Sequence, residues 1–256
     1  MTQGSTSPDS GTTHFGFRTV AEDEKAGMVR AVFDAVAPKY DLMNDLMSAG
    51  VHRLWKAAMV DMLAPRPGEA ILDMAGGTGD IAFRLLDRIG TSGAPITVCD
   101  INAAMLGVGR DRAIDRGKLE GLSWACANAE TLPYPDMTFD AYTIAFGLRN
   151  VTHIDVALAE ARRVLKPGGR FLCLEFSKVV VPILDKLYDT YSFSVLPWLG
   201  QLVAGDREAY KYLAESIRRF PDQNALAERM KAVGLTHVKV RNLSGGIAAL
   251  HLGWRI

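Results

Sequence analysis

Between residues 70 and 176 the sequence alternates short apolar runs with amphipathic stretches, and this alternation constrains the fold more than any other feature. Apolar runs rich in β-branched residues are typical of buried strands, whereas apolar residues about three to four apart are typical of helices. Because parallel neighbouring strands need a crossover helix, the alternation predicts a mostly parallel sheet with helices on both faces. The predicted strands are residues 70–74, 96–99, 122–126, 139–145 and 170–176, and the predicted helices are 80–89, 103–116 and 155–165, the last ended by a Lys-Pro-Gly-Gly turn at 166–169.

The segments on either side add helices and a closing hairpin. Residues 22–63 read as helical, and further helical patterns cover 183–202, 206–219 and 222–232. The apolar anchors predicted for the first of these segments are Phe33, Val36, Leu54, Trp55, Met59 and Leu63. Two strand-like runs at 236–242 and 247–254 are joined by Leu-Ser-Gly-Gly, which is typical of a hairpin. We therefore predict an α/β fold with a mostly parallel, seven-stranded sheet, a C-terminal antiparallel hairpin strand and added N-terminal helices.

Composition narrows the class of protein and its location. Lys and Arg total 29 and Asp and Glu total 29, so a zero net charge gives no sign of nucleic-acid binding. Residues 1–13 are almost entirely polar residues, glycine and proline, and we predict a disordered tail over 1–21 followed by a single domain over 22–256. This start resembles neither a signal peptide nor a transit peptide, which predicts a cytoplasmic protein.

We predict structural roles, without disulfides, metal or a membrane span, for the cysteines, the histidines and the longest apolar stretch. Cys99, Cys126 and Cys173 each lie in a strand-like run, as small buried residues of a reduced protein do. The five histidines show no ligand spacing, so we predict no metal site. Residues 179–205 are interrupted by charges and two prolines and are not expected to span a bilayer.

The loop after the first predicted strand is a candidate nucleotide site. Gly76-Gly-Thr-Gly79 joins that strand to a helix, and glycines there allow a ligand to approach the backbone closely. Asp100 ends the next strand, 21 residues after Gly79, where a carboxylate can accept the hydroxyls of a ribose. The loop alone leaves three alternatives open: an NAD(P)-dependent oxidoreductase with the fingerprint Gly77-x-Gly79-x-x-Ala82, a methyltransferase that uses S-adenosylmethionine, or a tight turn without a ligand.

Residues further along the chain favour the methyltransferase. The segment 127–140, "ANAETLPYPDMTFD", follows the third strand, where methyltransferases place polar contacts to the adenine. The segment 162–176, "RRVLKPGGRFLCLEF", is similar to the helix, turn and strand that end their cofactor-binding half. The Tyr-x-x-x-Lys pair of a short-chain dehydrogenase does not occur in the sequence.

Several longer motifs resemble one family, the ubiquinone/menaquinone biosynthesis C-methyltransferases. They are "THFGF" (13–17), "VFDAVAPKYDLMNDLMSAGVHRLWK" (32–56), "LDMAGGTGD" (72–80), "ANAETLPYPD" (127–136), "FGLRNV" (146–151), "LKPGG" (165–169), "YDTYSFSVLPWLG" (188–200) and "YLAESIRRFPDQ" (212–223). The resemblance implies a Rossmann-like class I methyltransferase that transfers a methyl group from S-adenosylmethionine to a ring carbon of a prenylated quinol. It also implies a helical cover over 22–66, a cofactor-binding half over 67–178, a helical substrate region over 179–232 and a closing hairpin over 233–256.

The resemblance carries over to individual cofactor residues. It implies contacts to S-adenosylmethionine from the loop, from Asp100 at the ribose and from the segment near the adenine. The residues concerned are Asp73, Gly76, Gly77, Thr78, Asp100, Asn128 and Ala129. One position departs from the pattern, because many relatives have a serine where this chain has Ala145. A hydroxyl contact to the cofactor is therefore missing here.

The proposed catalytic residues follow from the chemistry of the acceptor. A quinol ring becomes a carbon nucleophile when its hydroxyl loses a proton, and an isolated phenol titrates near about 10. Arg149 directly follows a buried strand, where a cation can stabilise the developing oxyanion. Tyr40 is the second predicted catalytic residue, and His52 is a further candidate.

The sequence leaves the head group, the oligomeric state and membrane association open. Apolar side chains between 184 and 202 are dense enough to pack on the sheet, to line a channel for the prenyl tail or to dock at the inner face of a membrane. These apolar side chains are Leu184, Leu187, Tyr188, Tyr191, Phe193, Leu196, Trp198, Leu199 and Leu202.

A non-catalytic subunit that binds the cofactor and scaffolds a quinone-biosynthesis complex is an alternative function from a different class of protein.

Overall fold

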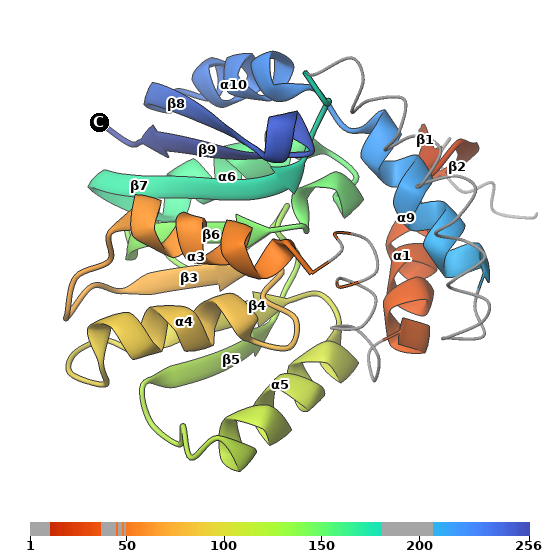
Figure 1. Ribbon diagram of the computed structural model, residues 1–256. Coiled ribbons are helices and arrows are strands. Elements are labelled where there is room, and N and C mark those ends of the chain that lie inside the picture. Colours follow the sequence, from red (N-terminus) through yellow and green to blue (C-terminus); the bar gives the residue numbers. More distant parts are fainter. Residues whose placement is uncertain (1–10, 37–44, 46–47, 49, 181–206) are drawn as a thin grey trace, which may run out of the picture.

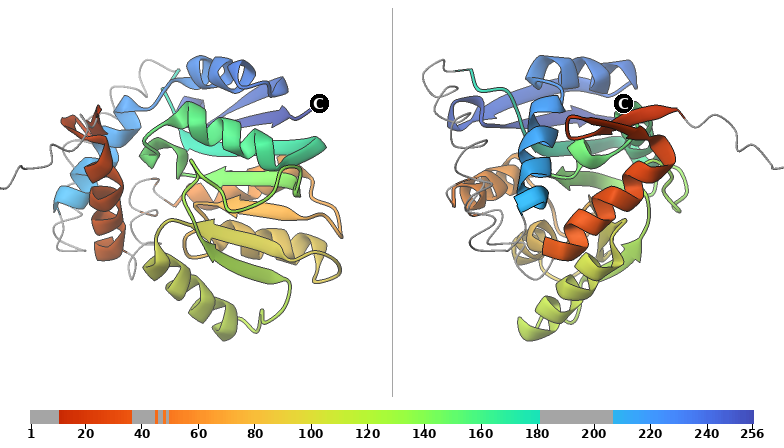
Figure 2. Two further views of the ribbon diagram at one scale, coloured as in Figure 1. Left: turned by 180° about the vertical axis from the view of Figure 1, so that it is seen from behind. Right: turned by 90° about the vertical axis from the view of Figure 1, so that its right-hand side faces the viewer.

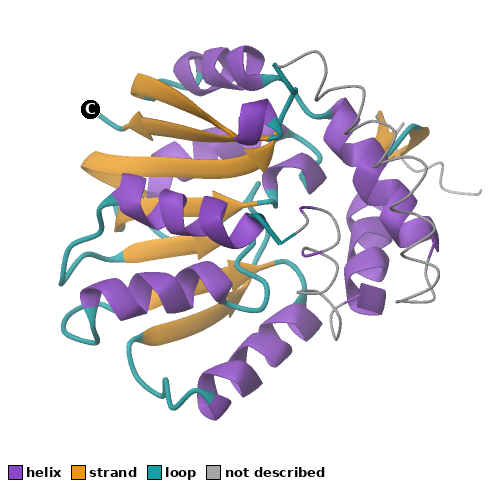
Figure 3. Cartoon of the chain, viewed as in Figure 1, coloured by secondary structure: helices purple, strands orange, loops and turns teal. Residues whose placement is uncertain are grey.

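The computed structural model of the chain describes residues 11–36, 45, 48, 50–180 and 207–256. Within these residues a twisted sheet is flanked by helices on both faces, and further helices lie beyond one end of its strands (Figure 1, Figure 3). The predicted α/β class is confirmed. Tyr40 and the apolar side chains of residues 184–202 lie outside the described residues.

The sheet has seven strands in the order β5-β4-β3-β6-β7-β9-β8. Neighbours from β5 to β7 pair in parallel, whereas β9 runs antiparallel to both of its neighbours, β7 and β8. The bounds are Ile71–Met74 (β3), Ile96–Asp100 (β4), Leu122–Cys126 (β5), Phe139–Ala145 (β6), Leu165–Phe176 (β7), Thr236–Leu243 (β8) and Ala248–Trp254 (β9). The mostly parallel sheet with its closing antiparallel strand is therefore as predicted.

Two layers of helices cover the sheet. Helices α3 and α4 pack with one face into one core, and α6 and α10 pack with the other face into a second core (Figure 1). The bounds are Glu22–Val36 (α1), His52–Leu63 (α3), Asp80–Ile89 (α4), Ala103–Asp115 (α5), Ile154–Val164 (α6), Arg207–Arg219 (α9) and Gln223–Ala232 (α10). The helix predicted over 80–89 has the bounds of α4, because its apolar residues recur at helical spacing on the buried side.

One of the apolar anchors predicted in helix α3, Leu54, is not buried. Trp55 is only 4% exposed and donates from Nε1 to Ser244 Oγ at 2.9 Å, so this ring does join the helix to the core. Leu54, its neighbour, is 70% exposed and is not a core residue. Adjacent helical residues point about 100° apart, and here Trp55 faces the core whereas Leu54 faces solvent.

The first described residues form a hairpin. Strand β1 (Thr12–Phe15) pairs antiparallel with β2 (Arg18–Ala21), so the prediction of disorder is wrong for residues 12–21. The Phe15 ring stacks on the Tyr212 ring with centroids 4.1 Å apart, and the Phe17 amide donates to Glu215 Oε2 at 3.0 Å. These contacts to α9 hold the hairpin, and the sequence alone does not show them because they join residues far apart in the chain.

Strand β7 begins earlier than the sequence predicts. Leu165 already pairs with Phe139, and the register shifts before pairing resumes. The Gly168 amide donates to the Arg255 carbonyl, and the Arg255 amide donates to the Gly169 carbonyl. Arg255, near the end of the chain, thus pairs with residues 168 and 169, so the segment that was predicted to form a turn is part of the strand.

Helices α1 and α9 and the β1–β2 hairpin lie together beyond the carboxyl ends of the parallel strands, where all views place them (Figure 1, Figure 2). Ligands of open α/β sheets bind at this end. Among the described residues no helix is long and apolar enough to cross a bilayer.

Candidate active site

A cavity of about 840 Å³, its mouth included, lies between the carboxyl ends of the parallel strands and α1. Its lining comes from the loops after four strands and from one side of the helix. These residues are Met74, Ala75 and Gly77 at and after the end of β3; Asp100, Ile101, Asn102 and Met105 at and after the end of β4; Asn128, Ala129 and Glu130 after β5; Ile144, Phe146, Gly147, Asn150, Val151 and Thr152 at and after the end of β6; and Ala26, Val29, Arg30 and Phe33 of α1. We call it the first cavity.

The glycine loop at the bottom of this cavity has no room for side chains. Gly77 has φ +53°, a left-handed conformation that favours glycine. A Cβ at Gly76 would lie 2.7 Å from Val98 Cγ1 and 3.0 Å from the Asp73 carbonyl oxygen. The Gly76 amide donates to the Cys99 carbonyl at 3.0 Å, which ties the loop to β4. The first cavity is therefore bounded there by bare backbone.

Asp100 holds the loop and faces the first cavity. Its Oδ2 accepts the Gly77 amide at 2.9 Å, and its Oδ1 accepts the Asn102 amide at 2.8 Å. Burial raises the pKa of Asp100 to about 6, although these amide bonds favour the ionised form. A carboxylate has about four acceptor positions, so two remain for the hydroxyls of a ligand.

Asn102 is a site residue that the sequence analysis missed. It is the N-cap of α5, with its Oδ1 accepting the Met105 amide at 3.0 Å. Its Nδ2 donates to Asp34 Oδ1 on α1 at 2.8 Å, so it connects the covering helix to the loop that carries Asp100. An asparagine just before a helical pattern is a common N-cap signal and marks such a position in the sequence.

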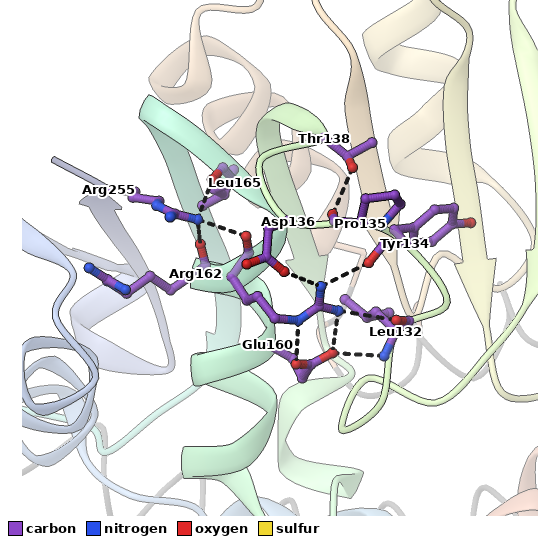
Figure 4. A network of polar contacts seen from close by, with 10 residues as sticks. Leu132, Tyr134, Pro135, Asp136, Thr138, Glu160, Arg162, Leu165 and Arg255 are labelled. Carbon is purple, nitrogen blue, oxygen red and sulfur yellow. Dashed lines mark hydrogen bonds and ion pairs between the residues drawn. The ribbon is translucent and has the colours of Figure 1, made fainter.

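Asn128 and Ala129, two of the predicted cofactor residues, line the first cavity, and a polar network holds the segment that follows them (Figure 4). Arg163 on α6 donates to the carbonyl oxygens of Leu132 and Tyr134 at 3.1 and 2.8 Å. Glu160 Oε2 accepts the Leu132 amide at 2.9 Å. The segment after β5 is thereby fixed from the α6 side.

Asp73, Gly76 and Thr78, three predicted cofactor residues, do not line the first cavity. Asp73 Oδ1 accepts from Thr143 Oγ1 at 2.8 Å, whereas its buried Oδ2 has no partner among the described residues. Burial raises the pKa of Asp73 to about 7. Thr78 is buried, and its Oγ1 accepts from Arg112 Nη1 at 3.1 Å.

Arg149 is buried and does not line the first cavity. Its Nη1 donates to Glu175 Oε1 at 2.7 Å and to the Phe146 carbonyl at 2.6 Å, and the two charged side chains are only 2% and 1% exposed. Burial raises the pKa of Glu175, against the attraction of the guanidinium. The Arg149 Nε is buried without a partner among the described residues.

A second cavity lies on the Arg149 side. Its lining includes Arg149, Lys25, Tyr212 and Ser216, and it shares Val151 and Thr152 with the first cavity. Arg149 was predicted to lie beside the cofactor, but it lines the second cavity, next to the residues that the two cavities share. Glu175 was not recognised in the sequence, although an acid inside the apolar run "FLCLEF" signals a buried partner.

The turn that carries Arg149 brings other residues to the first cavity. Phe146 has φ +58°, which is strained for a residue with a bulky side chain, and residues Leu148–Asn150 form a short 3₁₀ helix. A Cβ at Gly147 would lie 2.3 Å from Ala75 Cβ. Asn150 lines the first cavity and was not among the predicted site residues.

Two further sequence candidates lie outside the lining. His52 is buried at the start of α3, with Nε2 2.9 Å from Asp45 Oδ1, and burial lowers its pKa. Ala145, where many relatives have serine, is also outside the lining of the first cavity. In the part of the chain that the structure describes, no group of three or more His, Cys, Asp or Glu side chains could hold a metal ion.

Solved structures with this arrangement include S-adenosylmethionine-dependent methyltransferases. One from Thermotoga maritima matches with a TM-score of 0.63 and 19% identity, covering 88% of this chain and 99% of that one. Another from Aquifex aeolicus matches with a TM-score of 0.58 and 16% identity, covering 78% and 89%. At these identities the likeness concerns the fold.

Sequence relatives are much more similar. The Ubiquinone/menaquinone biosynthesis C-methyltransferase UbiE of Paracoccus denitrificans is 59% identical over 244 residues, which cover 95% of this chain and 97% of the relative. The protein of the same name from Cereibacter sphaeroides is 59% identical over 247 residues, covering 96% and 98%. The model of the ubiE/COQ5 methyltransferase family matches residues 18–255. The fold, the glycine loop with Asp100 and these matches lead to one conclusion: the chain belongs to the ubiE/COQ5 methyltransferase family.

Proposed function

We propose that this protein transfers a methyl group from S-adenosylmethionine to a ring carbon of a prenylated quinol, in ubiquinone and menaquinone biosynthesis. The observation that carries the proposal is the first cavity, in which bare glycine backbone, Asp100 and the turn after β6 meet. Membership of a methyltransferase family supports this reading over a dinucleotide-dependent oxidoreductase.

The residues present fit S-adenosylmethionine. Asp100 offers free acceptor positions for ribose hydroxyls, and Gly77 presents its backbone, without a side chain, to the first cavity. Asn128 and Ala129 line the first cavity after β5, and their proposed role is contact with the adenine. Asp73 and Thr78 do not line the first cavity, and we propose that they support the cofactor loop and do not contact the cofactor.

The cofactor, when bound, supplies an activated methyl group that a ring carbon accepts as S-adenosylhomocysteine departs. The protein must therefore make the ring carbon nucleophilic by favouring loss of the hydroxyl proton to water. Tyr40 remains a proposed catalytic residue on the segment between α1 and α3. Arg149 cannot act as a base, because a guanidinium stays protonated.

We assign Arg149 to the stabilisation of negative charge on the acceptor oxygen. Because Glu175 balances the charge of the guanidinium, the contribution comes from its remaining N–H donor and not from net charge. A buried donor without a partner is costly in the resting protein, and an acceptor oxygen or an ordered water at Nε removes that cost.

The direct test of the proposed function is product analysis. Purified protein is incubated with methyl-labelled S-adenosylmethionine and with demethylated benzoquinols or naphthoquinols, and the product mass is measured. Label in the ring of either quinol supports the proposal and identifies the head group. Tight binding of the cofactor without methyl transfer to either quinol favours the scaffold alternative.

Cofactor affinity is expected to fall as the pH drops through about 6, where Asp100 takes up a proton. The raised pKa means that the carboxylate is ionised above this pH, and only the ionised form accepts charge-assisted bonds from ribose hydroxyls. Below it, affinity should fall by at most about tenfold per pH unit. Calorimetric titration from about pH 8 to about pH 5 measures the effect.

The matched variant for this titration is Asp100→Asn, which has no proton to gain. Its affinity should be lower than that of the wild type at neutral pH and nearly independent of pH over the same range. A pH slope that persists in Asp100→Asn would assign the titration to another group, with Asp73 the first to examine.

Activity is expected to be unaffected by excess EDTA. A carbon acceptor activated by loss of a phenol proton does not need a chelated catechol, and the described residues bring together no metal-ligand cluster. Initial rates with and without the chelator decide the point. Loss of activity that magnesium restores would contradict the prediction.

We also propose that the protein acts at the inner face of the membrane, because a polyprenyl tail concentrates the acceptor in lipid. The apolar segment around residues 184–202 is the proposed contact, and association with other enzymes of quinone biosynthesis is part of the same proposal. Flotation with vesicles that contain a prenylated quinol, compared with vesicles that lack it, tests the lipid contact.

A further inference from the structure

Tyr212 of α9 forms a hydrogen bond across the wall between the two cavities. Its hydroxyl donates to Asn150 Oδ1 at 3.0 Å, 62 residues away in the sequence. The ring lines the second cavity and is 4% exposed, whereas Asn150 lines the first cavity. Burial raises the pKa of Tyr212 and keeps its hydroxyl protonated, so it remains a donor.

This bond fixes the orientation of the Asn150 amide. The Oδ1 and Nδ2 atoms lie on opposite arms of one planar group, so holding Oδ1 also fixes where the two N–H groups of Nδ2 point. Among the described residues, Nδ2 has no recorded hydrogen-bond partner. Asn150 thus brings a neutral, oriented donor to the first cavity.

The Tyr212 ring is itself held in place. It stacks on Phe15 of the β1–β2 hairpin with centroids 4.1 Å apart and an interplanar angle of 15°. Removal of the hydroxyl alone leaves this stacking intact, so the packing and hydrogen-bonding contributions of Tyr212 can be separated. A role in packing only would not require the hydroxyl.

We propose that Tyr212 is a positioning residue for methyl transfer: its hydroxyl holds the Asn150 amide so that Nδ2 donates to the oxygen of the acceptor ring. The inference rests on the proposed function. A preorganised donor at a developing oxyanion stabilises the transition state more than the bound substrate. In this arrangement the amide of Asn150 donates from the first cavity, whereas Arg149 lies at the second cavity, on the other side of the turn after β6.

The proposal predicts effects on the acceptor and not on the cofactor. Tyr212→Phe should lower kcat/KM for the quinol about tenfold, as loss of one neutral hydrogen bond does. Asn150→Ala removes the donor itself and should lower it about 100- to 1000-fold. Cofactor affinity should stay within about twofold in both variants, since neither side chain contacts Asp100 or the glycine loop.

A double-mutant cycle tests the link between the two residues. In the Asn150→Ala background, Tyr212→Phe should have no further effect, because there is no amide left to orient. Tyr142→Phe is the control, since Tyr142 is also a buried tyrosine but lies outside the first cavity. Its kcat/KM should match the wild type.

Each outcome decides one point. A silent Tyr212→Phe, or a loss that is multiplicative with that of Asn150→Ala, overturns the positioning role while wild-type turnover still supports the proposed function. Wild-type protein that methylates no quinol overturns the proposed function, and the positioning role falls with it. Equal losses in Tyr212→Phe and Tyr142→Phe would assign the effect to general destabilisation and would also overturn the inference.

Discussion

Replacing Arg149 by alanine is expected to lower the turnover number by about two to three orders of magnitude, as removal of one oxyanion donor does. Cofactor affinity should stay within a few-fold of wild type, because Asp100 and the glycine loop lie on other strands. Steady-state rates at saturating cofactor and calorimetric titration of the same preparation measure the two effects. Arg149→Lys should recover little, since an ammonium lacks the planar fork of donors.

The alanine variant alone is ambiguous because it also leaves Glu175 buried without its partner. Breaking a buried ion pair in this way costs about 3–5 kcal/mol of stability. The pair Arg149→Met with Glu175→Gln removes both charges and keeps a side-chain oxygen for the amides of Arg149 and Phe176, which should bring the free energy of unfolding closer to that of the wild type than in Arg149→Ala. The double variant separates stability from catalysis.

Methyl transfer should remain low in this stable double variant if Arg149 stabilises the acceptor oxygen. Recovery of near-normal turnover along with stability would show that the pair serves only to hold the turn between β6 and β7. A defect that vanishes at saturating cofactor would instead place Arg149 in cofactor binding.

The parallel half of the fold could be predicted from the sequence because its signals are local. The apolar period of α4 and the glycines before it define a strand, a tight loop and a helix with correct bounds. Asp100 follows from its spacing after that loop and indeed lies in the first cavity. Local patterns thus locate the acid that we propose for the ribose.

Apart from Asn102, whose N-cap signal is local, the missed features depend on contacts between distant residues. The partner of Arg149 is Glu175, 26 residues further on, and the Tyr212–Asn150 bond joins residues 62 apart. The β1–β2 hairpin is held by Phe15 against Tyr212 of α9, a contact between residues far apart in the sequence. No periodicity reports such pairings, so the sequence placed Arg149 at the right strand end but could not show that it is buried.

Replacing Asp100 by alanine is expected to weaken cofactor binding about ten- to hundredfold, which corresponds to a loss of about 1.5–3 kcal/mol in charge-assisted hydrogen bonds. The structure gives two reasons for the loss. The ribose hydroxyls lose their acceptor, and the amides of Gly77 and Asn102 lose the carboxylate that holds the loop. Calorimetric titration near neutral pH measures the affinity, with thermal unfolding as the check on folding.

Two variants divide the effect of Asp100 between its contacts. Asp100→Asn retains one acceptor oxygen and similar volume, so it should bind the cofactor more tightly than Asp100→Ala but more weakly than the wild type. Asp115→Ala, an exposed acid at the end of α5, is the surface control and should bind as the wild type does. Unchanged affinity in Asp100→Ala would remove Asp100 from the ribose site. The first cavity would then have to hold the cofactor through its backbone amides and through Asn128.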